Sequence, residues 1–124
     1  MRRLMLVIGS KPLMRIWRQN VGSICIRDRK GSPIGWFHAG PPAGAADISG
    51  IVGPEGWRIE IETKGAVTKQ SEAQIVFGRV VTSNGGIYIV CRYDAAQDMD
   101  VNLQRAEVEI ESAIELRRRM MRAA

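Results

Sequence analysis

Apolar and polar residues alternate on both sides of a short turn in the middle of this chain, and this pattern restricts the fold to one that contains a β-hairpin. Residues 46–52 and 57–64 alternate in this way, and the four residues between them, 53–56, read Gly-Pro-Glu-Gly, which are turn formers at hairpin length. If the hairpin closes symmetrically about the centre of the turn, its side chains separate by parity onto two faces. The apolar face then comprises Ile48, Val52, Trp57, Ile59 and Ile61.

The other face of the hairpin brings acidic residues together. Symmetric closure places Asp47 opposite Glu62 and Ser49 opposite Glu60. Opposed carboxylates with Cβ atoms about 5 Å apart repel by roughly 3 kcal/mol at an effective dielectric near 20. Lys64, on the same face, supplies one positive charge, whereas a divalent cation neutralises the pair more completely. Because carboxylate and carbonyl oxygens are the preferred ligands of ions such as Mg²⁺, the hairpin indicates a metal site.

A Glu-x-Lys tripeptide on a hairpin also fits an ordinary solvated face, on which Glu60, Glu62 and Lys64 are surface charges. Three neighbouring features favour the metal site: a glycine-rich run ends at Gly44, an acid lies directly opposite Glu62, and a helix that bears Gln74 follows. Glu60 itself is interpreted as a peripheral charge rather than a ligand.

Helices and strands are also expected along the rest of the chain. The patterns predict helices over residues 2–8, 71 to about 84, and about 98–122, and strands over residues 13–17, 23–27 and 87–92. Three glycines and two prolines between residues 35 and 44 predict an irregular loop. This order predicts a mixed α/β fold, in which a mixed β-sheet is flanked by helices, in a single domain over residues 1–124.

Two of the predicted helices carry further signals. Ser71, followed three residues later by Gln74, is typical of a capping box at a helix N-terminus. The apolar face of that helix is expected to comprise Ala73, Ile75, Val76, Val80 and Val81. The C-terminal helix has an apolar stripe of Leu103, Ala106, Ile110, Ala113 and Ile114.

Composition restricts the class of protein. With 124 residues, 45% of them hydrophobic and 25% charged, the chain resembles a globular domain large enough for one core. Its apolar run at residues 4–8 is too short for a signal peptide or a membrane span, so we expect a cytoplasmic protein without membrane association. Cys25 and Cys91 lie in apolar runs and are expected to be free thiols. A net charge of +5 fits a nucleic-acid partner and equally fits a soluble basic protein without one.

Five motifs, taken in chain order, carry a resemblance to a known family. They are Arg18-Gln19-Asn20-Val21-Gly22, Gly44-Ala45-Ala46-Asp47 continuing into Ile48-Ser49-Gly50, Glu62-Thr63-Lys64, Gln74, and Gly85-Gly86-Ile87-Tyr88. Together they resemble the PD-(D/E)xK nuclease superfamily and, more narrowly, the VRR-NUC family of virus-type replication and repair nucleases. The resemblance covers about residues 4–90, and the C-terminal helix lies outside it.

The resemblance implies a restriction-endonuclease-like core and a metal-dependent deoxyribonuclease. Asp47, Glu62 and the carbonyl of Thr63 would hold Mg²⁺ or Mn²⁺, which activates water for attack on a phosphate. Lys64 would position that water and stabilise the developing charge. Gln74 would orient Lys64 or touch the phosphate, although it equally fits a role confined to the capping box.

The resemblance also implies partners. Bacterial and phage proteins of this short kind are expected to act as homodimers on branched DNA such as four-way junctions. Phosphate contacts are expected from Lys11, Arg18, Asn20 and Lys69, with an ordinary solvated role as the alternative for the lysines. One candidate dimer interface is the C-terminal helix, which carries Val108, Met120 and Met121 besides its core stripe, although this helix also fits packing wholly on its own domain.

One departure from the family pattern affects the site. Family members usually carry a glutamate at the start of the first helix, whereas this chain begins Met1-Arg2-Arg3. Either the chain begins late, or the site has fewer acidic groups. The second case favours an alternative function, a non-catalytic or degenerate DNA-binding module of the same fold.

Histidine and tryptophan add few constraints. His38, the only histidine, lies in the predicted loop, where a solvated side chain is favoured over a general base. Trp17 and Trp57 are expected in the core, whereas Trp36 with Phe37 fits either packing or stacking on bases.

Overall fold

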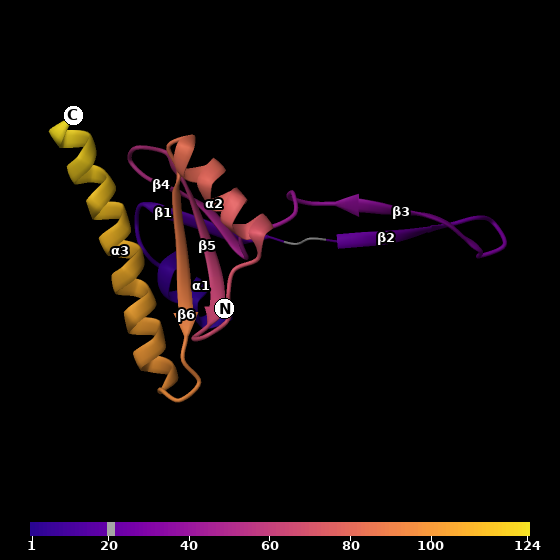
Figure 1. Ribbon diagram of the computed structural model, residues 1–124, viewed down its shortest axis with the longest axis horizontal. Helices are drawn as coiled ribbons and strands as arrows, with labels where there is room; N and C mark the ends of the chain where they lie inside the picture. Colours follow the sequence, from indigo (N-terminus) through magenta and orange to yellow (C-terminus); the bar gives the residue numbers. More distant parts are fainter. Residues whose placement is uncertain (20–21) are drawn as a thin grey trace.

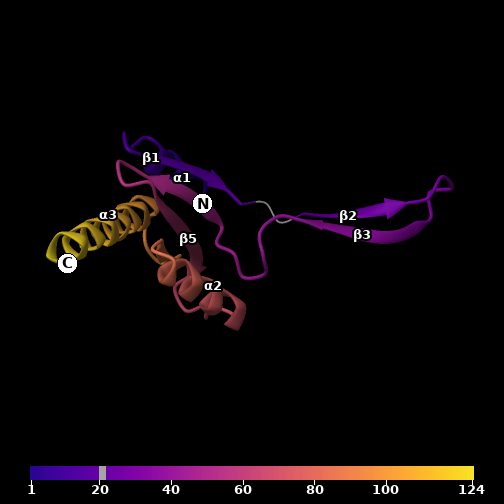
Figure 2. The ribbon, with the colours of Figure 1, turned by 90° about the horizontal axis from the view of Figure 1, so that it is seen from above.

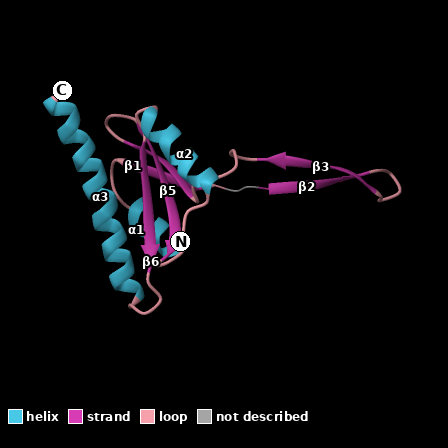
Figure 3. Ribbon diagram, in the orientation of Figure 1, coloured by secondary structure: helices cyan, strands magenta, loops and turns pink. Residues whose placement is uncertain are grey.

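The computed structural model describes residues 1–19 and 22–124 and has a mixed α/β architecture with three helices and two sheets (Figures 1 and 3). In chain order the elements are α1 (Arg2–Gly9), β1 (Met14–Arg18), β2 (Gly22–Arg27), β3 (Pro33–Ala39), β4 (Ile48–Val52), β5 (Trp57–Gly65), α2 (Glu72–Ser83), β6 (Ile87–Tyr93) and α3 (Met99–Ala123). The main sheet has the order β1-β4-β5-β6, and β2 and β3 form a separate two-stranded sheet.

The central hairpin has the register that symmetric closure predicts. Ile48 pairs with Ile61, Ser49 with Glu60, and Val52 with Trp57, in an antiparallel ladder. β1 pairs antiparallel with β4, and β6 pairs parallel with β5, so the main sheet is mixed. The parallel pair requires a crossover between β5 and β6, which α2 provides.

The two faces of the main sheet have different coverings (Figures 1 and 2). α1 and α3 pack on the apolar face, and the core there includes the fully buried side chains of Ile8, Ile48, Ile59, Ile61 and Ile110. The predicted apolar stripe of α3 is confirmed, because Ala106, Ile110 and Ile114 are buried and Leu103 and Ala113 pack against them. Among the described residues, no helix is long and apolar enough to span a membrane.

α2 packs on the opposite, polar face, and its predicted apolar face is wrong. Ile75, Val76 and Val80 are exposed, whereas Gly78 is buried. A Cβ atom at Gly78 would lie 2.8 Å from the Tyr88 ring, so the missing side chain lets the helix approach β6. The apolar periodicity gave a wrong prediction because α2 packs on the face of the sheet that carries acids and hydroxyl groups, not on an apolar surface.

The predicted loop over residues 35–44 is also partly wrong, because its first half belongs to β3. Cys25 pairs with Trp36 across the β2–β3 ladder. The carboxylate of Asp28 accepts bonds from the backbone N–H groups of Lys30 and Ser32 and so closes the turn between the two strands. Ile34, Trp36 and Phe37 have high β propensity, which outweighs the glycine at position 35. Irregular backbone is confined to residues 40–47, before β4.

Candidate active site

Asp47 is fixed at the point where β4 begins. Its Oδ2 accepts hydrogen bonds from the backbone N–H of Thr63 at 2.9 Å and from the hydroxyl of Thr63 at 2.7 Å. Its backbone carbonyl accepts from the N–H of Gln19 at 2.9 Å. The β4–β5 ladder therefore ends at the pair Ile48–Ile61. The side chain of Asp47 is bonded to Thr63 of β5, and Asp47 does not form the predicted ladder pair with Glu62.

Glu62 is a buried carboxylate with one oxygen bonded and one not. The side chain lies on β5 and the residue is 3% exposed. Its Oε1 accepts from Gln74 Nε2 at 2.9 Å and lies 3.9 Å from Lys64 Nζ. Its Oε2 is buried and has no hydrogen-bond partner among the described residues. An anionic oxygen in this position loses its hydration without compensation, which costs free energy unless another group binds it.

The electrostatics of Glu62 follow from this environment. The pKa of Glu62 is raised from 4.5 to about 7, mainly by burial and in addition by the charge of Asp47, while the charge of Lys64 acts in the opposite direction. The metal-free protein therefore holds Glu62 as a mixture of acid and carboxylate near neutral pH. A cation beside Asp47 and Glu62 would favour the ionised form.

Gln74 completes the capping box, as predicted, and also bonds to Glu62, a contact that the sequence did not predict. The capping box is complete: the Ser71 hydroxyl accepts from the N–H of Gln74, and the Gln74 carbonyl oxygen accepts from the N–H of Ser71. The amide of the same side chain donates to Glu62. Gln74 thus orients the acid, rather than Lys64, and ties it to the first turn of α2.

The alternative of a solvated hairpin face is wrong for both glutamates of β5. Glu60 is 1% exposed; its Oε2 accepts from the Ser49 hydroxyl at 2.6 Å and its Oε1 pairs with the guanidinium of Arg58. Glu60 is therefore a buried structural anion and not a peripheral charge. Since both of its oxygens already have partners, Glu60 differs from Glu62, which has one oxygen without a partner in the described part of the chain.

Gln19 is a functional candidate that the sequence analysis did not single out. Besides holding the backbone of Asp47, it donates from Nε2 to the Ser49 hydroxyl at 2.5 Å. It therefore connects Asp47 to the Ser49–Glu60 pair. Its place within the Arg18–Gly22 motif was the available signal.

Tyr88, on β6, also lies close to the acids. Its hydroxyl accepts from Gln70 Nε2 at 3.0 Å, and burial, followed by the charge of Glu62, raises its pKa above the usual value. The phenol therefore stays neutral at physiological pH and keeps its proton as a hydrogen-bond donor. Tyr88 belongs to the Gly85–Tyr88 motif, which did not indicate that its hydroxyl would lie close to the acids.

The predicted phosphate contacts have mixed outcomes. Lys11 pairs with Glu107 and Glu111 and so connects the turn before β1 to α3, while its contact with DNA stays a prediction. Arg18 and Lys69 are exposed and remain predictions. Asn20 lies outside the described residues.

The tryptophans also differ in part from expectation. Trp17 is 38% exposed and has the guanidinium of Arg58 over its ring at 6.0 Å, so its predicted place in the core is wrong. Trp57 packs against the core with Arg117 over its ring at 5.8 Å. Trp36 and Phe37 are exposed on β3.

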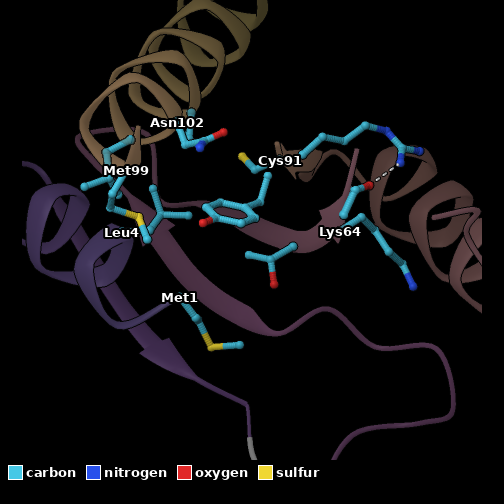
Figure 4. A pocket seen from close by; sticks show the side chains of 12 residues that line it. Met1, Leu4, Lys64, Cys91, Met99 and Asn102 are labelled. Atoms are coloured by element: carbon cyan, nitrogen blue, oxygen red, sulfur yellow. Dashed lines mark hydrogen bonds between the residues drawn. The ribbon is translucent and has the colours of Figure 1, made fainter. Parts of the chain in front are cut away.

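A pocket of about 360 Å³ lies between the helices α1 and α3 and the strands β5 and β6 (Figure 4). Figure 4 shows Met1, Leu4 and Met99 around it, while the side chain of Lys64 extends away from them. The end of α1 that reaches this pocket has no acidic residue in its first turn. α1 therefore adds no carboxylate to Asp47 and Glu62.

The acidic ligand set is accordingly small. Within the described part of the chain, no group of three or more His, Cys, Asp or Glu side chains is placed to hold a metal ion. The candidate ligands are two carboxylates, from Asp47 and Glu62, and the backbone carbonyl of Thr63. Such a set suits a hard cation that keeps several waters, as Mg²⁺ does.

Comparison with known proteins adds no family assignment: no family model matches the chain, and neither does any curated protein.

Proposed function

We propose that this protein is a metal-dependent DNA endonuclease of the PD-(D/E)xK type, similar to the VRR-NUC nucleases. The observation that carries the proposal is the buried Oε2 of Glu62, which has no hydrogen-bond partner among the residues that the structure describes. Glu62 is also affected by the charge of Asp47, and its other oxygen, Oε1, lies 3.9 Å from Lys64 Nζ. A buried anionic oxygen without a partner fits a bound cation, and a lysine beside two carboxylates fits the handling of a phosphate.

Asp47, Glu62 and the Thr63 carbonyl would hold Mg²⁺ or Mn²⁺. When bound, such an ion acts as a Lewis acid and lowers the pKa of coordinated water. The donor set fits because it contains only oxygen atoms and because Glu62 keeps one oxygen available.

The remaining side chains position these groups. Gln74 holds one oxygen of Glu62, and Gln19 holds the backbone of Asp47, so both acids have fixed orientations before substrate arrives. The side chain of Lys64 is 16% exposed, and its ammonium would compensate negative charge that develops on a phosphate. Preorganised charge of this kind stabilises a transition state without reorganisation at the moment of reaction.

DNA is the proposed substrate, with branched DNA preferred and a homodimer as the active form. The net charge of +5 favours a polyanion. One chain contributes one site, and symmetric cleavage of two strands at a four-way junction needs two sites related by a twofold axis. Exposed Val108, Met120 and Met121 on α3 leave a surface open for such an assembly.

The test is a cleavage panel with end-labelled duplex, flap and four-way-junction DNA, in Mg²⁺, Mn²⁺ and EDTA. We expect metal-dependent cuts by the wild-type protein and none by Glu62→Gln. Glu72→Gln makes the same chemical change at an exposed position of α2 and should cut normally. Absence of cleavage under every condition would reject the proposal.

A second candidate function is a DNA-binding module without catalysis. It is favoured by the two-carboxylate ligand set and by the absence of an acid in the first turn of α1. It predicts DNA binding that persists in EDTA and no cleavage by freshly purified protein in either metal.

A further inference from the structure

The β2–β3 sheet is a ribbon that extends away from the rest of the protein (Figures 1 and 2). It is inserted between Gln19 and Asp47, and these two residues are joined at its base by the hydrogen bond from the N–H of Gln19 to the carbonyl of Asp47. The residues on either side of this insertion therefore meet at Asp47. Anything bound at Asp47 lies close to the base of the insertion.

The ribbon exposes large apolar side chains that the core does not cover. Trp36 is 63% exposed and Phe37 is 56% exposed, and Ile26 and Ile34 are exposed as well. A two-stranded sheet is at best marginally stable in water unless a third strand or a packed helix supports it. Exposed aromatic side chains on such an element indicate a surface that a partner covers.

The charge of the ribbon favours an anionic partner. Its turn carries Arg27, Arg29 and Lys30 and a single acid, Asp28, which gives three positive charges against one negative. The carboxylate of Asp28 is already occupied by backbone N–H groups of the turn. Arg29 and Lys30 are exposed, and neither forms an ion pair with any residue that the structure describes.

The dimensions and chemistry also match nucleic acid. Six residues of β2 span about 20 Å, and a groove of about 12 Å admits a two-stranded ribbon. Aromatic side chains stack on bases that are not paired, and apolar side chains wedge between base steps. A branch point supplies such bases, whereas a continuous duplex does not.

We propose that the β2–β3 ribbon is a DNA-binding arm that selects branch points. Arg29 and Lys30 contact backbone phosphates, and Trp36 and Phe37 stack on bases that are unpaired at the branch, beside the Asp47–Glu62 site. The proposal rests on the proposed function for the identity of its ligand, and it supplies a structural cause for branch selectivity.

The test measures DNA binding by the full chain in EDTA, where the proposed nuclease cannot act. Fluorescence anisotropy compares a labelled 30-base-pair duplex with a four-way junction and a duplex that contains an unpaired bubble. Trp36→Ala should weaken binding to the junction and the bubble by about tenfold or more and change duplex binding far less. Arg29→Ala combined with Lys30→Ala should weaken binding to all three and lower the slope of log affinity against log salt by about two.

The matched control is Arg119→Ala combined with Arg122→Ala, which removes the same charge from the exposed end of α3 and should leave the preference for branched DNA unchanged. The ribbon variants should keep the melting temperature of the wild-type protein, since these side chains lie outside the core. Equal losses for duplex and junction in Trp36→Ala would overturn selection of branch points.

The ribbon could instead contact a second copy of the chain, and sedimentation of the same variants distinguishes this outcome. A dimer that dissociates in Trp36→Ala, with DNA affinity otherwise intact, would overturn the proposal. The proposed function fails separately: if the wild-type protein binds branched DNA through the ribbon but does not cut it, the arm stands and the nuclease does not.

Discussion

The amide of Gln74 donates a hydrogen bond to Oε1 of Glu62 over 2.9 Å, from a side chain that also caps the N-terminus of α2. A single residue thus joins the folding of a helix to the orientation of an acid. The other oxygen of Glu62 is buried and has no partner in residues 1–19 and 22–124, so Gln74 fixes which oxygen remains available to a cation.

Substitution at the capping box separates these two roles. Ser71→Ala removes only the hydroxyl that accepts from the N–H of Gln74, and should cost about 1 kcal/mol of stability without weakening metal binding. Gln74→Ala loses a capping bond and also the bond to Glu62, so it should lower metal affinity as well. Chemical denaturation and Mn²⁺ titration of both variants check this. Equal metal affinity in the two variants would contradict the orienting role.

Loss of the proposed catalytic groups should abolish cleavage and leave the fold intact. Asp47→Asn, Glu62→Gln and Lys64→Ala should each reduce the cleavage rate by a factor on the order of 100 or more, as loss of a single stabilising group does in other active sites. The side chain of each lies outside the apolar core cluster, so far-UV circular dichroism should be unchanged. Wild-type rates in any of the three would remove that residue from the site.

Metal binding should stabilise the folded protein. An ion that binds only the native state at one hundred times its dissociation constant adds about 2.7 kcal/mol, which raises the melting temperature of a domain of this size by several degrees. Because the ion relieves repulsion between Asp47 and Glu62, the rise should disappear in Asp47→Asn. Calorimetry with and without millimolar Mn²⁺ measures it, and Ca²⁺ serves as a second oxygen-binding ion.

The pKa of Glu62 predicts a pH dependence for the metal-free protein. The folded state has a pKa of about 7 for this residue, against 4.5 for an ordinary glutamate, so the folded chain binds this proton more tightly than the unfolded chain. The contribution of Glu62 to stability is therefore present below pH 4.5 and is lost as the pH rises to about 7, by up to about 3 kcal/mol.

Thermal melts between pH 5 and 8 in EDTA should show this loss in the wild-type protein. Glu62→Gln should lack it, since the amide does not titrate. Saturating Mn²⁺ should also reverse the trend, because proton and metal compete for the same carboxylate. A wild-type profile parallel to that of Glu62→Gln would show that the carboxyl group titrates normally.

Self-association should involve the exposed apolar side chains of α3. We expect a dimer at micromolar concentration, weakened by Met120→Lys combined with Met121→Lys, because a charge on each partner must then be desolvated in a twofold interface. Leu6→Lys, an equally exposed apolar position on α1, is the control. Analytical ultracentrifugation decides, and a strict monomer at all concentrations would reject both the dimer and symmetric junction cleavage.

The spacing of residues along the chain is enough to predict the central hairpin and its register. Alternation with a period of two can satisfy a half-buried pair of strands in only one way, since a shift by one residue would expose Ile48, Ile59 and Ile61. It also determined the capping box and the stripe of α3, because these depend on residues three or four positions apart in one helix. Local spacing therefore sufficed to place Asp47 near Glu62, whereas the contact between Gln74 and Glu62 depends on how α2 packs on the sheet.

What each of these residues does depends on contacts between elements that are distant in the sequence. The choice between Glu60 and Glu62 depends on which oxygens find partners, and those partners, Ser49, Arg58 and Gln74, lie on different elements. Lys11 became a structural residue because α3 brings Glu107 and Glu111 to it from about a hundred residues away. The apolar side chains of α2 are exposed because the helix packs on the polar face of the main sheet. The side chains of the ribbon are exposed because β2 and β3 form a sheet of their own, apart from the main sheet. Periodicity predicts which side chains share a face, but burial and charge pairing are properties of the surface that the face meets.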